Sequence, residues 1–196
     1  MTSPVAPLLL ASVSPQRRAI LGQLGLPFDV VAPRYDEAAI DGLSPVDLVR
    51  AHAQGKARSV ADEAGERPVL GVDTAVVVDG EVFGKPADAT VAERMLERLS
   101  GRTHEVVSGL CVVTPGWEEL LDETTRVTFR TLAPRDIASY LAAEEWEGRA
   151  GGYAIQGRGA ALVTRVEGDY LNVVGLPVAA LAGLLAERFP GAYGLG

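Results

Sequence analysis

The sequence predicts an α/β or α+β fold built around a mixed β-sheet with flanking helices. Three observations lead to this prediction. Strand-like apolar runs alternate with helix-like segments along the 196 residues. Asp79-Gly80 is a strong hairpin signal between two such runs, so at least one strand pair should be antiparallel. The 22 glycines and 12 prolines indicate many tight connections, which argues against a plain helical bundle.

The first half of the chain predicts two strands and two helices, and each helix has a clear start signal. Ser14-Pro15 and Ser44-Pro45 are both typical of a helix N-cap followed by proline at the first helical position. The first of these helices is expected to end before Gly25. A continuous apolar run at 8–10 is typical of a strand buried on both faces. The predicted strands are 8–10 and 28–31, and the predicted helices are 15–24 and 45–63.

The second half predicts a hairpin followed by further helices and strands. Asp79-Gly80 connects the strand 69–78 to a short return strand at 81–83. The amphipathic segment 89–99 predicts a helix. A glycine-rich passage at 148–159 separates the later elements. The remaining predicted strands are 104–114, 124–131 and 160–166, and the remaining predicted helices are 134–143 and 177–189.

The charge balance restricts the partners of the protein. With 18 basic and 26 acidic residues the net charge is −8, so the chain lacks the basic character of a general nucleic-acid-binding protein. We therefore expect neither a nucleic acid nor an anionic membrane surface as a partner. A small anionic ligand remains compatible, because a few cations in a cleft can override the global charge.

Cysteine usage and the N-terminal segment favour a cytoplasmic protein. Cys111 is the only cysteine, so an intramolecular disulfide and a cysteine-based metal site are both excluded. In its apolar context Cys111 is expected to be an inert buried residue. The apolar run 7–11 is too short for a signal peptide or a membrane span, and no basic leader precedes it.

Two charged residues interrupt apolar patterns. Lys56 shares the apolar face of its predicted helix, where a lysine either meets an anion or extends its stem along apolar surface to reach water. Asp73 interrupts the apolar run 69–78, where an unpaired carboxylate would be costly. The two readings of Asp73 are a functional carboxylate inside a buried strand and a strand that ends at Val72 before a bulge.

Basic and glycine-rich segments suggest a site for phosphates. Arg17 and Arg18 lie in the first turn of a predicted helix, whose free N–H groups attract anions, although a solvated side chain is the preferred reading of Arg18. Lys85 directly follows the hairpin, between a glycine and a proline that fix a tight loop. Gln156, in the glycine-rich passage, can both donate to and accept from a base edge. An exposed loop lysine and an irregular connection are the alternative readings of these two positions.

Several common catalytic motifs are absent from the sequence. There is no Walker phosphate loop, no GxGxxG after a strand and no GxSxG nucleophile elbow. His52 and His104 are isolated, so a histidine-rich metal site is not expected. Any metal would be a hard cation held by carboxylates and phosphate, which means Mg²⁺ or Mn²⁺.

Seven motifs occur in a fixed order along the chain. They are LASVSPQRR at 10–18, DE at 36–37, KA at 56–57, GVDT at 71–74 with GKP at 84–86, SGRTH at 100–104, AGGYAIQG at 150–157 and NVVGLP at 172–177. Together they resemble the Maf-like nucleotide pyrophosphatases, and the resemblance spans most of the chain.

The resemblance implies an enzyme that cleaves a nucleoside triphosphate between the α and β phosphates, giving a nucleoside monophosphate and pyrophosphate. It also implies a single domain over residues 1–196, with an elongated mixed sheet and two lobes around a cleft, related to the inosine-triphosphatase fold. Members of the family are cytoplasmic, depend on a divalent metal and are often dimeric, so a homodimer is expected.

The resemblance also assigns roles to particular residues. Asp73 matches the proposed general base of the family. On this basis Lys56, Lys85 and Arg17 would converge on the triphosphate, and Ser12 and the helix N-terminus would bind phosphate oxygens. Glu37 and Asp73 would hold the metal, Mg²⁺ or Mn²⁺.

Three positions bear on which nucleotide is cleaved. Thr74 and Gln156 look like the dTTP/UTP-cleaving branch of the family rather than the 7-methyl-GTP branch. Gln16 fits neither branch, since the dTTP/UTP branch has an arginine there and the 7-methyl-GTP branch an aromatic residue. The expected substrates are therefore dTTP and UTP. Because of Gln16, we expect weaker discrimination against other pyrimidine nucleotides, such as CTP.

Two alternative functions remain open from the sequence. One is a house-cleaning pyrophosphatase for inosine or xanthosine triphosphate on a similar fold. The other is a non-catalytic nucleotide-binding regulator of cell division. The presence of Asp73 beside Lys56 and Lys85 in the motif set favours catalysis, because a protein that only binds nucleotides would have little need of the aspartate.

Overall fold

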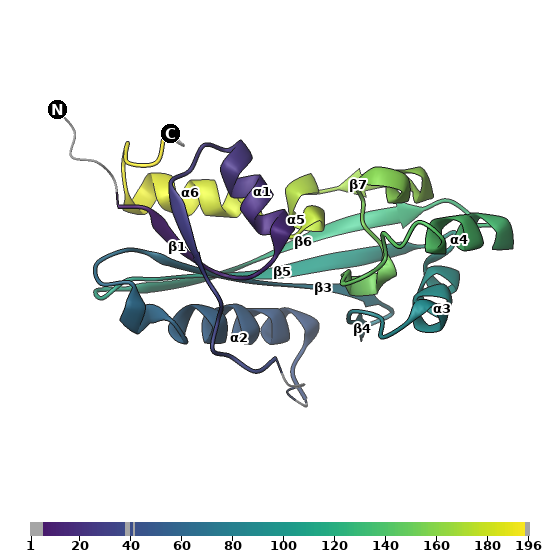
Figure 1. Ribbon diagram of the computed structural model, residues 1–196, viewed down its shortest axis with the longest axis horizontal. Coiled ribbons are helices and arrows are strands. Elements are labelled where there is room, and N and C mark those ends of the chain that lie inside the picture. The colour runs from purple at the N-terminus through teal and green to yellow at the C-terminus, as the bar shows by residue number, and fades with distance from the viewer. Residues whose placement is uncertain (1–5, 38–39, 41, 195–196) are drawn as a thin grey trace. The chain divides into compact units, whose positions relative to one another are not determined.

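The computed structural model describes residues 6–37, 40 and 42–194. Helices and strands alternate along these residues, with several short 3₁₀ turns (Figure 1). In chain order the elements are β1 (Leu8–Ala11), α1 (Pro15–Gln23), β2 (Phe28–Val31), α2 (Pro45–Arg58), η1 (Ala61–Glu63), β3 (Val69–Val78), β4 (Glu81–Phe83), α3 (Ala89–Leu99), β5 (Thr103–Val113), β6 (Glu118–Phe129), α4 (Pro134–Leu141), η2 (Ala150–Gly152), η3 (Gly157–Leu162), β7 (Val163–Glu167), α5 (Tyr170–Val174) and α6 (Val178–Arg188).

The strands of the described residues form one seven-stranded mixed sheet, which confirms the predicted fold class. The strand order is β2-β1-β3-β5-β6-β7, and β4 pairs with β3. β1 runs parallel to both β2 and β3. β4 returns antiparallel to β3 through the predicted Asp79-Gly80 turn, and β7 runs antiparallel to β6. The mixture of parallel and antiparallel pairs excludes a strictly doubly wound parallel sheet.

The chain divides into two compact units, and the division falls within β3, β5 and β6. The first unit comprises residues 1–73, 108–123 and 175–196, and the second comprises residues 74–107 and 124–174. Each unit has an apolar cluster of its own. The cluster of the first unit includes Leu9, Ala53, Val60 and Cys111, and that of the second includes Leu96, Val106, Val127 and Phe129.

In the first unit, helices cover both faces of the sheet. α2 lies on one face, and α1 and α6 lie on the other (Figure 1). α2 approaches the strands closely, because two strand glycines leave room for its backbone. A Cβ atom on Gly71 would lie 2.2 Å from the Ala53 carbonyl oxygen, and one on Gly109 would lie 2.3 Å from that of Val49. This close packing brings the side chains of α2 and β3 together.

The close approach at Gly71 predicts a large loss of stability on adding a single methyl group. We expect Gly71→Ala to lower the free energy of unfolding by about 3 kcal/mol, because the new Cβ would meet helix backbone that cannot rotate away. The measurement is urea-induced unfolding. Gly22→Ala is the matched control, since nothing lies within 4 Å of that position in α1, and it should be neutral or stabilising by up to about 1 kcal/mol. Equal unfolding midpoints for the two variants would contradict this packing.

In the second unit, His104 belongs to the apolar core. It is buried, its ring stands edge-on to Phe129 and Tyr153, and its Nε2 lies 2.7 Å from the Tyr153 hydroxyl. Burial lowers the pKa of His104 to about 4, so the imidazole is neutral near pH 7. Cys111, in the first unit, is likewise buried, and burial raises the pKa of its thiol to about 12. The prediction that Cys111 is buried is confirmed.

Several predicted boundaries are wrong, one for a local reason and one because of strand pairing. The helix expected to reach Glu63 ends at Arg58, where the Ser59 hydroxyl donates to the Lys56 carbonyl, and a separate 3₁₀ turn follows. β6 begins at Glu118 rather than at 124, because pairing with the long β5 overrides a run of acidic residues. β7 begins at Val163, after the 3₁₀ turns of η3, and the short α5 was not expected.

Among the residues that the structure describes, no helix is both long enough and apolar enough to cross a membrane.

Candidate active site

The loop between β1 and α1 is folded around the hydroxyl of Ser12. Ser12 is buried, and its Oγ accepts hydrogen bonds from the Ser14 backbone N–H and from Arg17 Nη1, both at 3.2 Å. The Ser14 side chain caps α1 by accepting from the Arg17 backbone N–H at 3.4 Å. Ser12 and Arg17 are thus held together beside the N-terminus of α1, where backbone N–H groups favour an anion.

The Arg17 guanidinium is fixed in this position and lies in the field of two carboxylates. Its Nε donates to the Gly175 carbonyl oxygen at 2.9 Å, within the NVVGLP segment. Burial lowers the pKa of Arg17, and the negative charges on Asp73 and Glu37 oppose that shift. Arginine stays protonated under these conditions, so the site keeps a permanent cation.

The ammonium of Lys56 is the centre of a buried charge cluster. Lys56 has only 4% of its surface exposed, and its Nζ lies 2.6 Å from Asp73 Oδ1 and 2.9 Å from Glu37 Oε1. A buried lysine requires such partners, because an unpaired charge in the interior is costly. Of the two alternatives left open for Lys56, the structure shows the anion-paired one; the stem does not extend to water.

Asp73 lies in the middle of a continuous strand. β3 runs without interruption from Val69 to Val78, and the reading in which it ends at Val72 is wrong. The other residues of β3 are buried, whereas Asp73 and Thr74 are half-buried. A carboxylate at this point is accommodated because Lys56 approaches from α2, which packs closely against the glycine at position 71.

The two carboxylates around Lys56 fit the requirements of a hard divalent cation. The side chain of Asp73 is 13% exposed and that of Glu37 is 48% exposed, so neither carboxylate is fully closed off from solvent. No group of three or more His, Cys, Asp or Glu side chains gathers within the described ranges. If a divalent cation binds here, Asp73 and Glu37 would supply two oxygen ligands, and phosphate oxygens and water would supply the others, as is usual for Mg²⁺.

Gln16 lies against the cap of α1. Its Oε1 accepts a hydrogen bond from the Ser14 hydroxyl at 3.1 Å, and the residue is half-buried. The amide oxygen is therefore engaged locally, and the amide nitrogen is the part of the side chain that remains to meet a ligand. An arginine at this position would replace the amide with a charged fork of donors.

The other three predicted site residues belong to the second unit. Thr74 follows Asp73 in β3, Lys85 is exposed in the loop after β4, and Gln156 is exposed just before η3. The loop of Lys85 is joined to the glycine-rich passage that leads to Gln156, because the Gly151 N–H of η2 donates to the Gly84 carbonyl oxygen at 3.0 Å. The predicted residues therefore fall into two groups: Ser12, Gln16, Arg17, Glu37, Lys56 and Asp73 in the first unit, and Thr74, Lys85 and Gln156 in the second.

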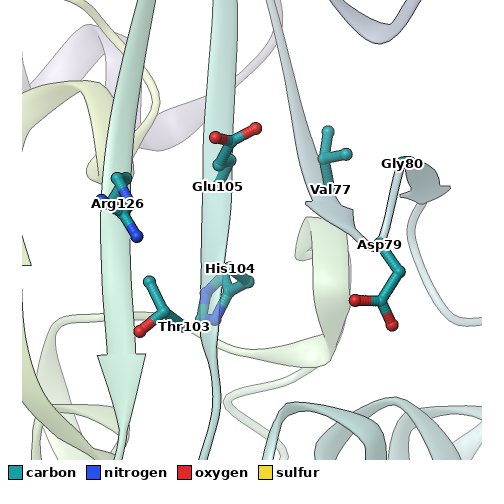
Figure 2. A pocket seen from close by; sticks show the side chains of 7 residues that line it. All are labelled: Val77, Asp79, Gly80, Thr103, His104, Glu105 and Arg126. Carbon is teal, nitrogen blue, oxygen red and sulfur yellow. The ribbon is translucent and has the colours of Figure 1, made fainter.

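A separate polar hollow of about 260 Å³ lies in the second unit (Figure 2). Figure 2 shows Glu105 and Arg126 on neighbouring strands and Asp79 at the hairpin turn. Asp79 is ion-paired with Arg102. None of the nine predicted site residues lines this hollow, whose lining consists of Val77, Asp79, Gly80, Thr103, His104, Glu105 and Arg126.

Two residues next to the charge cluster were missed by the sequence analysis. Tyr35 Oη lies 3.1 Å from His52 Nδ1, and His52 is buried on α2. The available signal was spacing: His52 precedes Lys56 by four residues and so shares its helical face. Tyr35 directly precedes the acidic pair that includes Glu37.

The chain resembles known proteins over most of its length. The profile of the Maf-like protein family matches residues 7–188. A protein of Moorella thermoacetica named dTTP/UTP pyrophosphatase is 50% identical over 181 residues, covering 91% of this chain and 93% of the relative. A Symbiobacterium thermophilum protein of the same name is 49% identical, covering 87% and 88%. Among solved structures, a HAM1 protein from Coxiella burnetii has a TM-score of 0.50 at 15% identity, covering 93% of this chain and 99% of that one, which bears on the fold alone.

Proposed function

Because the chain belongs to the Maf-like family, we propose that it hydrolyses dTTP and UTP between the α and β phosphates, giving the nucleoside monophosphate and pyrophosphate. The observation that carries this proposal is the buried Lys56 ammonium between Asp73 and Glu37. Relatives named dTTP/UTP pyrophosphatase support the choice of nucleotide.

Each residue of the first unit has a distinct part in the proposed reaction. The N-terminus of α1, Ser12 and Arg17 bind phosphate oxygens and neutralise their charge. Lys56 holds Oδ1 of Asp73, and we assign the other oxygen, Oδ2, to orienting and deprotonating the attacking water. Loss of pyrophosphate then depends mainly on positioning and on neutralising the charge that develops on the leaving group.

A divalent cation, Mg²⁺ or Mn²⁺, would be held by Asp73 and Glu37 together with substrate phosphates. Bound there, it supplies Lewis-acid polarisation of the phosphoryl oxygens. For Lys85, Thr74 and Gln156 of the second unit, the roles implied by the family resemblance stay predictions: the lysine for the phosphates and the other two for the base. A homodimer and a cytoplasmic location stay predictions.

The direct test is product analysis with a panel of nucleotides. Purified protein with Mg²⁺ or Mn²⁺ is expected to release pyrophosphate, rather than orthophosphate, from dTTP and UTP. ITP, XTP, CTP and 7-methyl-GTP complete the panel and separate the alternative specificities. Binding of nucleotides without any release of pyrophosphate would contradict the proposal and favour a nucleotide-binding regulator.

Gln16→Arg tests whether the side chain at position 16 contacts the base of the nucleotide. We expect it to sharpen the preference for dTTP and UTP over CTP by about fivefold, because one polar contact in a partly open site contributes about 1 kcal/mol. The measurement is kcat/KM for dTTP, UTP, CTP and 7-methyl-GTP on both forms. Arg18→Gln, at the exposed neighbouring arginine, serves as the control and should leave the ratios unchanged. Unchanged ratios in Gln16→Arg would show that position 16 does not contact the base.

A further inference from the structure

The segment that carries Glu37 is fastened to the neighbourhood of α2 just before it reaches the charge cluster. The Arg34 backbone N–H donates to Ser59 Oγ at 3.0 Å, and its guanidinium is ion-paired with Asp62 and Glu63 of η1. The next residue, Tyr35, makes the second attachment through its hydrogen bond to His52. Two successive residues are thus bound before the chain continues to Glu37.

The ring of Tyr35 fits into a notch on α2 that only a glycine leaves open. A Cβ atom at Gly55 would lie 2.1 Å from Tyr35 Cε2 and 2.5 Å from Cζ, so the ring takes the place of a side chain at position 55. Glycine is unfavourable inside a helix, and Gly55 lies within α2. The contact with Tyr35 is a physical reason for a glycine at this point.

The notch lies beside the charge cluster of Lys56, Asp73 and Glu37. His52, Gly55 and Lys56 follow one another on adjacent turns of α2. Two residues of chain span at most about 7 Å, so anchoring Tyr35 restricts where the Glu37 backbone can lie.

We propose that Tyr35, seated over Gly55 and hydrogen-bonded to His52, is a positioning residue that holds the Glu37 carboxylate at Lys56. The inference rests on the proposed function, in which Glu37 helps to hold the divalent cation. The side chain of Glu37 is half-exposed and lies in a segment without helix or strand. Ordering such a side chain costs conformational entropy, and the Tyr35 anchor lowers that cost by fixing the backbone beforehand.

Gly55→Ala separates positioning from stability. Alanine is favoured over glycine in a helix interior, so the thermal midpoint should hold or rise, but the new Cβ displaces the Tyr35 ring. We expect kcat/KM for dTTP to fall about tenfold and the Kd for Mn²⁺, measured by electron paramagnetic resonance with α,β-methylene-dTTP bound, to rise about fivefold. Tyr35→Ala should give the same changes, and Tyr35→Phe, which keeps the ring, should give smaller ones.

The double variant Gly55→Ala/Tyr35→Ala should lose no more than either single variant, because both changes act through one contact. Gly22→Ala, which meets nothing within 4 Å in α1, is the control and should leave both readouts unchanged. An unchanged Mn²⁺ affinity in Gly55→Ala and Tyr35→Ala, or full additivity in the double variant, would overturn the assignment. Absence of pyrophosphate release from the unaltered protein would instead defeat the proposed function, and Mn²⁺ binding would still decide the role of Tyr35.

Discussion

Asp73→Asn is expected to lower kcat for dTTP hydrolysis by at least ~100-fold. The substitution keeps the shape of the side chain and its place in β3. It removes the base that is proposed to act on water, and it removes one negative charge that would hold the divalent cation. Lys56 keeps an acceptor, because the amide oxygen can take the position of Oδ1. The thermal midpoint should therefore change far less than the turnover does.

Steady-state kinetics with a pyrophosphate readout provide the measurement for Asp73→Asn. Asp29→Asn is a matched control, since Asp29 is also a strand aspartate of the first unit that is ion-paired with a cation, Arg67. The control should keep kcat close to that of the unaltered protein. Near-normal turnover in Asp73→Asn would mean that another group activates the water.

Lys56→Met is expected to lower kcat/KM for dTTP by ~100-fold. Methionine keeps the length of the apolar stem but removes the ammonium that lies within 3 Å of both Asp73 and Glu37. The two carboxylates then repel one another, and Asp73, which is nearly buried, loses its charged partner. The same change removes a cation from the proposed triphosphate site.

Arg58→Met is the control for Lys56→Met, because it removes a positive charge from the same helix two residues away. Arg58 is exposed and ion-paired with Glu118, so its loss should have little effect on kcat/KM. Kinetics and thermal midpoints are to be measured on both variants. Equal activities of the two would mean that the ion pairs of Lys56 are structural and that its ammonium takes no part in the reaction.

The order of the helices and strands could be predicted because the signals that start and end them depend on local patterns. Ser14-Pro15 and Ser44-Pro45 are local start signals, since the cap and the proline act on the first turn alone, and both helices begin as predicted. Asp79-Gly80 sets a hairpin for a similar reason. Boundaries that depend on a distant partner were not predictable in this way: β6 begins at Glu118 because β5 pairs with it.

The motifs determined the family, and the profile match over residues 7–188 confirms it. They also named Lys56 and Asp73 as residues of interest, but each had two readings that helix and strand periodicity could not separate. Burial and pairing are properties of the packed molecule: the choice required knowing that α2 lies on β3 and that Gly71 lets the two approach.

By itself the sequence determined the mixed α/β class, the family and the identity of the charged residues, because these follow from residue types and short spacings. Only the tertiary structure decided that Lys56 joins Asp73 to Glu37, that Ser12 holds Arg17, and that Tyr35 fills the notch at Gly55. Such contacts join segments that are distant in the chain, and their energies depend on desolvation and distance, which arise only when the helices and strands pack.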